Sequence, residues 1–176
     1  FKRGYDEEGS VQMSSLCFSF ANIDSYDYIN GPTLYVWKDE STPLYKAVRS
    51  GKYPLVDTHF CNNLVGPDVI QCNAGHMTVD TTDPWAISEA MILGRQKAVQ
   101  YLEAMKDVRP STFSNAFVVK TASLLGVRDS RRIEGDYIFT VEDWRQRKSF
   151  EDEIGRNCYY IDVHSGKHKP EHYKKG

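Results

Sequence analysis

The strongest constraint on the fold is one long helical pattern between residues 83 and 110. Asp83 can accept the first free helical N–H groups, and Pro84 suits the first turn because the N–H that it lacks would be unpaired there. Apolar or small residues then recur at three- and four-residue steps until Pro110, which is typical of a helix with one buried face. The pattern predicts a long helix that begins at Pro84 and ends before Pro110.

Around this helix the sequence favours short extended runs. Leu16, Phe18 and Phe20 alternate with smaller residues, which predicts a strand within residues 10–21. Further extended runs are predicted at residues 33–38, 55–60, 69–73, 116–122 and 131–139, with a turn at 66–68. Short helices are predicted after Thr42-Pro43 and after Thr140. This order of elements predicts an α+β domain with a mainly antiparallel sheet, one long helix and several short helices.

Length and charge suggest one domain with a tail. The 176 residues are 40% apolar, so residues 1–164 can bury one core, whereas residues 165–176 are lysine-rich and we expect them to form a loosely ordered basic tail. A formal charge of -2 gives no general attraction to nucleic acid or anionic lipid, and no signal sequence or apolar stretch of about 20 residues is visible. We therefore expect a soluble chain without nucleic-acid or membrane partners, while its compartment stays open. The polar opening after Phe1 suggests a segment excised from a larger protein.

Glycine spacing excludes several motifs. No two glycines lie closer than five positions apart, so the chain contains neither the G-x-G-x-x-G dinucleotide turn nor the G-x-S-x-G nucleophile elbow. The H-E-x-x-H zinc helix and the glycine-rich phosphate loop are also missing from the sequence. We conclude that the chain alone does not bind FAD or NAD in the Rossmann manner.

Two polar clusters remain as candidate sites. His59, Cys61, Cys72 and His76 are residue types that suit zinc or a Cys/His nucleophile, although neither spacing is typical and buried cysteines are common, so we expect no metal site. The second cluster is the arginine-rich run at residues 128–132, which could clamp an anionic substrate or form surface ion pairs. Because neighbouring side chains of a strand point to opposite faces, Arg131 and Arg132 cannot both line one pocket.

The arginine run also carries a family resemblance. Residues 126–137 read GVRDSRRIEGDY, which is similar to the segment G-V-R-E-S-R-R-I-x-G-x-Y of a family of FAD-dependent oxidoreductases. The resemblance continues through FTVED at 139–143 and YIDVH at 160–164, and upstream through TD at 82–83 and GRQ at 94–96. It spans roughly residues 10–164.

The resemblance implies that residues 1–164 are the substrate or cap domain of a flavoprotein whose FAD-binding segments are absent from this sequence. FAD would then be the cofactor of the intact protein, with none bound to this chain alone, which would be inactive. The family's arginines map to Arg128, Arg131 and Arg132 and its histidine to His164, near the flavin. The segment at residues 72–76 is CNAGH where the family usually has F-N-x-T-R, so Asn73 matches and His76 replaces an arginine.

These correspondences give a hypothesis for each site residue. His76 or His164 is the candidate general base in hydride transfer to the flavin, while Arg128, Arg131, Arg132 and Asn73 are candidates for binding a small-molecule substrate. The partners implied are the missing FAD-binding segments of the same polypeptide, and the interdomain face left uncovered would allow the chain to dimerise. The competing hypothesis is a stand-alone carbohydrate- or protein-binding module without a redox role.

Overall fold

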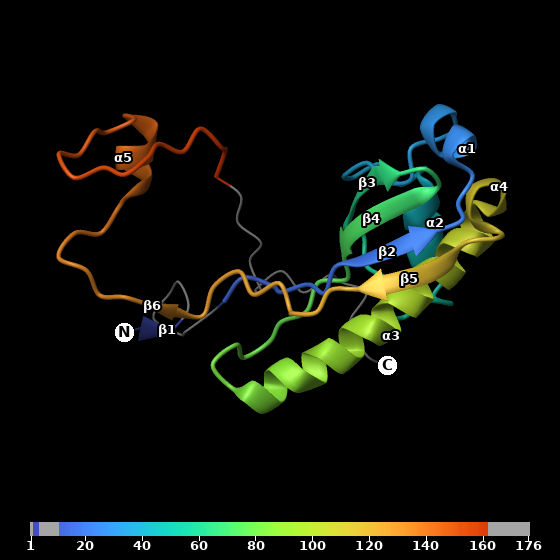
Figure 1. The fold of residues 1–176 in the computed structure, drawn as a ribbon, viewed down its shortest axis with the longest axis horizontal. Helices are drawn as coiled ribbons and strands as arrows, with labels where there is room; N and C mark the ends of the chain where they lie inside the picture. Colours follow the sequence, from blue (N-terminus) through green and yellow to red (C-terminus); the bar gives the residue numbers. More distant parts are fainter. Residues whose placement is uncertain (1, 4–10, 162–176) are drawn as a thin grey trace.

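The computed structural model describes residues 2, 3 and 11–161. A compact part built from a sheet and helices lies beside an extended arm that contains the last described residues (Figure 1). In chain order the elements are β1 (Lys2–Arg3), β2 (Phe18–Ala21), α1 (Ser25–Asn30), α2 (Pro43–Arg49), β3 (Phe60–Gly66), β4 (Val69–Ala74), α3 (Pro84–Val108), α4 (Pro110–Phe113), β5 (Phe117–Thr121), β6 (Arg131–Arg132) and α5 (Val141–Arg145). This arrangement confirms the predicted α+β class.

The main sheet is a four-stranded antiparallel sheet with the order β3-β4-β2-β5. The predicted turn at 66–68 joins β3 and β4 into a hairpin, but the prediction of a strand at residues 55–60 was wrong because β3 starts only at Phe60. Leu55 is held by side chains of α3 instead: its N–H donates to Gln100 Oε1 (3.0 Å) and its carbonyl accepts from Lys97 Nζ (2.9 Å). The backbone at Leu55 is therefore used by the helix and not by a neighbouring strand.

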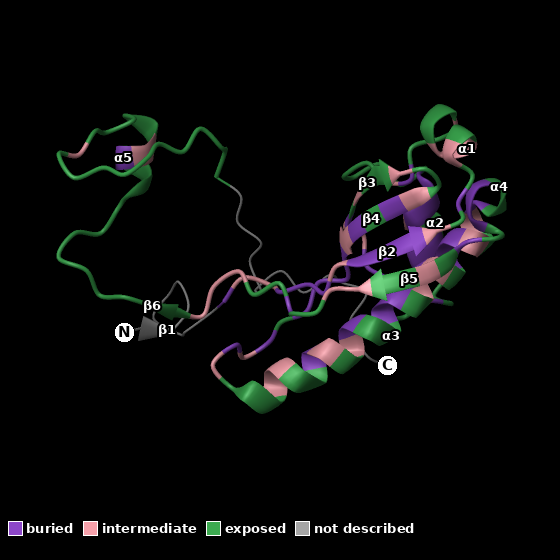
Figure 2. Ribbon diagram, viewed as in Figure 1, coloured by how far each residue is buried: buried purple, intermediate pink, exposed green. Residues whose placement is uncertain are grey.

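One face of the sheet forms the main core. Phe18 and Phe20 are buried and pack with Phe60 and Ile70 of the hairpin, but Ser19 between them is buried as well, so β2 is covered on both faces and not on one as predicted. Figure 2 shows the buried residues concentrated on the central strands and along one side of α3. The regular strand is shorter than the predicted range of 10–21, because β2 covers only Phe18–Ala21.

Helix α3 confirms the predicted boundaries and contributes to two cores. The Asp83 carboxylate accepts from the N–H of Trp85 (2.9 Å), and Pro84 occupies the first turn. The second half of the helix packs into the main core, which contains Tyr101 and Met105. The first half packs into a second, smaller core. Its members are Leu16, Met77, Val79, Ala90 and Leu125.

The short helices agree only in part with the sequence. Helix α2 follows Thr42-Pro43 and α5 follows Thr140 with a complete capping box, both as predicted. Helix α1, capped by Asp24, was not predicted, because six residues are too few to show helical periodicity. The extended run predicted at 33–38 contains bends and turns without a strand.

The predicted strand at residues 131–139 is mostly wrong. Only Arg131 and Arg132 pair with another strand, β1, whereas Ile133, Ile138 and Phe139 are exposed on the arm and lie outside any strand. No described strand pairs with them. His164 and the predicted tail at 165–176 lie outside the described residues. Among the described helices, none has both the length and the apolar run that crossing a bilayer requires.

Candidate functional site

Three of the candidate site residues lie in segments that run together past one end of the main sheet. At this end β2 begins, and β4 and β5 end, because β2 is antiparallel to both neighbours. Beyond the sheet the three segments stay together: Ser14 forms a bridge with Met77, and Ser15 forms a bridge with Gly126. The segments that carry Asn73, His76 and the arginine run are thus held at a common edge, although they are far apart in the sequence.

His76 follows β4 and is nearly buried, with 9% of its surface exposed. Its backbone N–H donates to Asp57 Oδ2 (2.8 Å). Its ring lies beside that of His59, with 4.3 Å between the ring centroids and an angle of 48° between the planes. The segments that precede β3 and follow β4 therefore place two imidazole rings side by side.

Asp57 fixes the backbone of both histidines. Its Oδ1 atom accepts from the N–H of His59 (2.9 Å), while its Oδ2 atom accepts from the N–H of His76. The Tyr101 hydroxyl donates to Asp57 Oδ1 (2.9 Å) and accepts from the N–H of Asp57 (3.1 Å). Only 4% of Asp57 is exposed, so these hydrogen bonds replace the water that the carboxylate loses on folding.

Lys97 places a second buried charge near Asp57. Burial raises the pKa of Asp57, and the positive charge of Lys97 together with the hydrogen bonds opposes this rise. Burial lowers the pKa of Lys97, while Asp57 opposes that change. Each group therefore stabilises the charged form of the other in a site that otherwise disfavours charge.

The geometry contradicts the zinc hypothesis. The rings of His59 and His76 are neighbours and Cys61 Sγ lies 3.5 Å from His59 Nε2, but Cys72 belongs to the main core on the other face of the hairpin. Cys61 lies opposite Asn73, which is the neighbour of Cys72 on β4. Because neighbouring side chains of a strand point to opposite faces, the Cys61 and Cys72 thiols lie on opposite faces of the sheet. Among the described residues no group of three or more His, Cys, Asp or Glu side chains is arranged to hold a metal ion.

Arg128 is the member of the arginine run that lies closest to the sheet in sequence, and it is half-buried. Its Nε atom is buried and has no hydrogen-bond partner within the described part of the chain. Its charge reaches Cys17, where burial raises the pKa of the thiol and Arg128 opposes the rise. A buried guanidinium N–H without an acceptor is costly, which favours an anionic or carbonyl oxygen as its natural partner.

The other predicted residues lie in different surroundings. Asn73 is half-buried, and its Oδ1 atom accepts from the hydroxyl of Ser15 (2.7 Å). Arg131 and Arg132 are exposed on β6 at the base of the arm, as adjacent residues of one strand. The structure thus brings Asn73, His76 and Arg128 to one sheet end and leaves the other two arginines further along the chain.

Sequence reasoning missed Asp57, Tyr101 and Lys97. The first two residue types are common in loops and cores and gave no signal. Lys97, by contrast, falls among Gly94, Ala98 and Tyr101 on the apolar face of α3, and a charge within an apolar stripe indicates a buried partner. That position could have led to Asp57.

Arg128 and Asn73 place hydrogen-bond donors at this sheet end, since Arg128 carries a buried Nε–H and Asn73 carries an amide group. The buried carboxylate of Asp57 lies beside the His76 segment and accepts its backbone N–H. The segments that meet here therefore carry both hydrogen-bond donors and a buried carboxylate.

The fold is an α+β domain in which the segments that carry Arg128, Asn73 and His76 meet at one end of an antiparallel sheet. The chain belongs to the FAD dependent oxidoreductase family, because the model of that family matches residues 1–175. No curated protein and no solved structure matches the chain. Family membership implies FAD as the cofactor of the intact enzyme and confirms the resemblance found in the sequence.

Proposed function

We propose that the chain is the substrate-binding portion of an FAD-dependent oxidoreductase and is inactive without the FAD-binding part of the polypeptide. The observation that carries the proposal is the buried Nε–H of Arg128, which lacks an acceptor within the described residues and lies in the segment most similar to the family. The glycine spacing supports the proposal that the chain is inactive on its own, because the sequence has no G-x-G-x-x-G turn for binding FAD. The family match favours this role over a stand-alone module.

The residues of this chain have separate roles in the proposal. FAD, when bound, supplies the hydride acceptor. Arg128 and Asn73 bind and orient oxygen atoms of the substrate, and Arg131 or Arg132 adds a positive charge at the base of the arm. His76 or His164 removes the proton from the substrate group that is oxidised. The position of His76 supports its candidacy, because its nearly buried imidazole follows the strand that carries Asn73.

The test uses the full polypeptide with its FAD-binding part. We expect Arg128→Met to lower the rate of substrate-driven flavin reduction by about 10- to 100-fold, since a hydrogen bond to a charged group contributes about 1.5–3 kcal/mol. Arg145→Met is the matched control, because Arg145 is exposed on the arm. The rate is followed by the loss of flavin absorbance in a stopped-flow instrument. Equal rates in the Arg128 variant and the wild type would contradict the proposed role.

Alanine variants of Arg132 and His164 test the remaining roles in the same assay. We expect slower flavin reduction in both, and an altered pH profile for the histidine whose imidazole accepts the proton. If both variants reduce the flavin at the wild-type rate, the family-based assignment of these residues is wrong. The 176-residue chain by itself should purify colourless and show no flavin absorbance after incubation with FAD.

We also propose that the apolar side of the arm faces the FAD-binding part of the same polypeptide. Ile133 and Ile138 are 92% and 79% exposed, and Phe139 is exposed beside them. Such a run of exposed apolar side chains normally has a partner. In the chain alone this face should cause dimerisation, which Ile138→Lys should suppress in light-scattering measurements; a monomeric wild-type chain would contradict the idea.

A further inference from the structure

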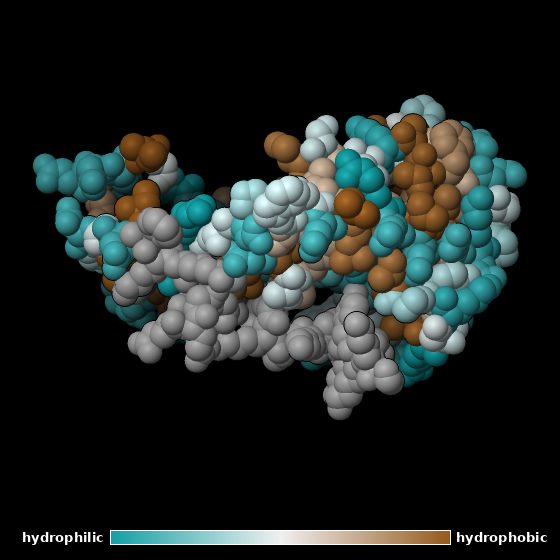
Figure 3. Space-filling view, turned by 90° about the horizontal axis from the view of Figure 1, so that it is seen from below, coloured by the Kyte–Doolittle hydropathy of each residue, from teal (hydrophilic) through white to brown (hydrophobic). Residues whose placement is uncertain are grey.

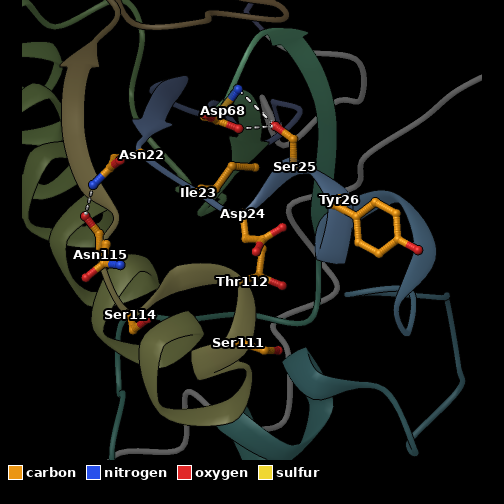
Figure 4. A pocket seen from close by; sticks show the side chains of 10 residues that line it. All are labelled: Asn22, Ile23, Asp24, Ser25, Tyr26, Asp68, Ser111, Thr112, Ser114 and Asn115. Carbon is orange, nitrogen blue, oxygen red and sulfur yellow. Dashed lines mark hydrogen bonds between the residues drawn. The ribbon is translucent and has the colours of Figure 1, made fainter.

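A surface hollow lies at the opposite end of the main sheet from the candidate site. Here β2 ends, and β4 and β5 begin, so the hollow is bordered by Asn22, Asp68 and Asn115, which adjoin these strands. Helices α1 and α4 close its other sides, and its volume is about 420 Å³. Figure 4 shows the Asn22–Asn115 pair on one side and Tyr26 on the other, with Asp24 between them.

The lining of the hollow is almost entirely polar. Nine of its ten residues carry a side-chain hydrogen-bonding group, and no Lys, Arg or His is among them. Two carboxylates can only accept hydrogen bonds, while the amides and hydroxyls can both donate and accept. Such a set matches a neutral ligand with many hydroxyl groups, because each hydroxyl also donates and accepts. It does not suit a phosphate or a carboxylate, which would face Asp24 and Asp68 without a compensating cation.

An exposed aromatic ring makes the lining more specific. Tyr26 borders the hollow with 78% of its surface exposed, although its ring is large enough to favour burial. An aromatic ring beside a polar hollow can cover the apolar C–H face of a pyranose, while the polar groups bind the hydroxyls at its edge. The combination separates this hollow from a mere group of acidic residues.

The polar groups are held in place before a ligand arrives. Ser25 Oγ donates to Asp68 Oδ1 (2.7 Å) and accepts from the N–H of Asp68 (2.9 Å), and Asn22 Nδ2 donates to the carbonyl of Asn115 (3.0 Å). Two backbone hydrogen bonds fix the segment at residues 23–24. The N–H of Ile23 donates to the Asp68 carbonyl (3.3 Å), and the N–H of Asp24 donates to the Thr112 carbonyl in α4 (2.9 Å). Pre-positioned groups lose little entropy on binding.

We propose that this hollow is a carbohydrate-binding site, in which Tyr26 stacks on a sugar ring and Asp68, Asp24 and the asparagines bind its hydroxyl groups. The site is separate from the redox chemistry, because the two ends of the sheet share no lining residue among those named for either. The open shape of the hollow predicts weak binding of a terminal sugar unit, as part of a larger glycan or of a glycosylated surface.

The test uses saturation-transfer NMR to measure binding of methyl glycosides to the full chain. The sugars are glucose, galactose, mannose and N-acetylglucosamine. We expect transfer from the protein to at least one glycoside and an affinity lower by roughly tenfold in Tyr26→Ala and in Asp68→Asn, the loss typical of one good contact. Tyr159→Ala and Asp136→Asn are matched controls, because both residues are exposed on the arm. These two variants should bind as the wild type does.

A variant that fills the hollow keeps the proposal testable if Tyr26→Ala or Asp68→Asn fails to fold. Ser114 is exposed at the end of α4, so Ser114→Trp should abolish binding while leaving the melting temperature nearly unchanged. Absence of transfer to every glycoside would overturn the proposal, as would equal binding by wild type and Ser114→Trp. Binding of spermidine in place of the glycosides would also overturn it, since the carboxylates would then serve a cation.

Discussion

The hydroxyl of Tyr101 offers the sharpest test of the buried network beneath the histidines. Tyr101→Phe removes one donor to Asp57 Oδ1 (2.9 Å) and one acceptor for the N–H of Asp57 (3.1 Å). The ring itself stays in place, stacked on Phe60 at 5.5 Å and tilted against Phe18 at 5.5 Å. The substitution therefore separates hydrogen bonding from packing.

The expected cost follows from the two lost contacts. A hydrogen bond to a charged acceptor contributes about 1.5–3 kcal/mol, and a buried N–H left without an acceptor costs about 1–3 kcal/mol. Both contacts involve Asp57, and losses that share one group do not simply add. We expect the free energy of unfolding to fall by about 2–4 kcal/mol. The pKa of Asp57 should rise further, because the Tyr101 hydroxyl opposes the effect of burial.

Urea unfolding followed by circular dichroism measures the change. The denaturation midpoint should fall while the dependence on urea concentration stays the same, since the surface exposed on unfolding is unchanged. Tyr26→Phe is the control, because this exposed side chain should lose less than about 0.5 kcal/mol. A Tyr101→Phe variant as stable as this control would refute the idea that the Asp57 network holds the histidine segments.

Three further outcomes are expected. Gly94→Ala should destabilise the chain, because the new Cβ would lie 2.6 Å from Leu16 Cβ. Overpacking costs about 1–3 kcal/mol, which exceeds the gain of about 1 kcal/mol in helix propensity. A raised melting temperature would contradict this prediction. Cys61, which is exposed, should react with a thiol reagent long before Cys72, whose pKa is raised by burial, and equal rates under native conditions would disprove the assignment. Hydrogen bonds, first from Thr140, lower the pKa of Asp143. Its stabilisation of α5 should therefore be full above the ordinary carboxyl value of about 3.9 and be lost as pH falls below it. Protection factors of the α5 amides, corrected for the intrinsic exchange rate at each pH, would argue against this if they stayed the same from neutral to strongly acidic pH.

Local signals made the helices and turns predictable. Asp83-Pro84 set the start of α3 and the pair Thr140 and Asp143 set the start of α5, because capping depends on residues three positions apart or fewer. The turn at 66–68 was likewise readable from its own residues. The limits of β3 were not, because the backbone at Leu55 is bound by side chains of α3 about 40 positions away.

The candidate site was predictable as residue types but not as a constellation. The sequence indicated Asn73 and Arg128 through their match to family motifs and His76 through its departure from one, each separately. It gave no indication that Asp57 would bind the backbone of His76, because a loop carboxylate has no periodic signature. The extended run after Arg132 was overestimated for a related reason: β-rich residues form a strand only where another strand is available to pair with them.

Helix α3 sets the spacing between the two halves of the candidate site. Gly75, which precedes His76, packs against side chains of its second half, whereas Leu125, three residues before Arg128, belongs to the small core under its first half. At 1.5 Å per residue the 25 residues of α3 give a helix about 37 Å long, and both halves of the site pack against this helix. A design that moves this arrangement to another protein scaffold must therefore include the whole of α3, because the site loops copied without the helix would lose the element that fixes the distance between them.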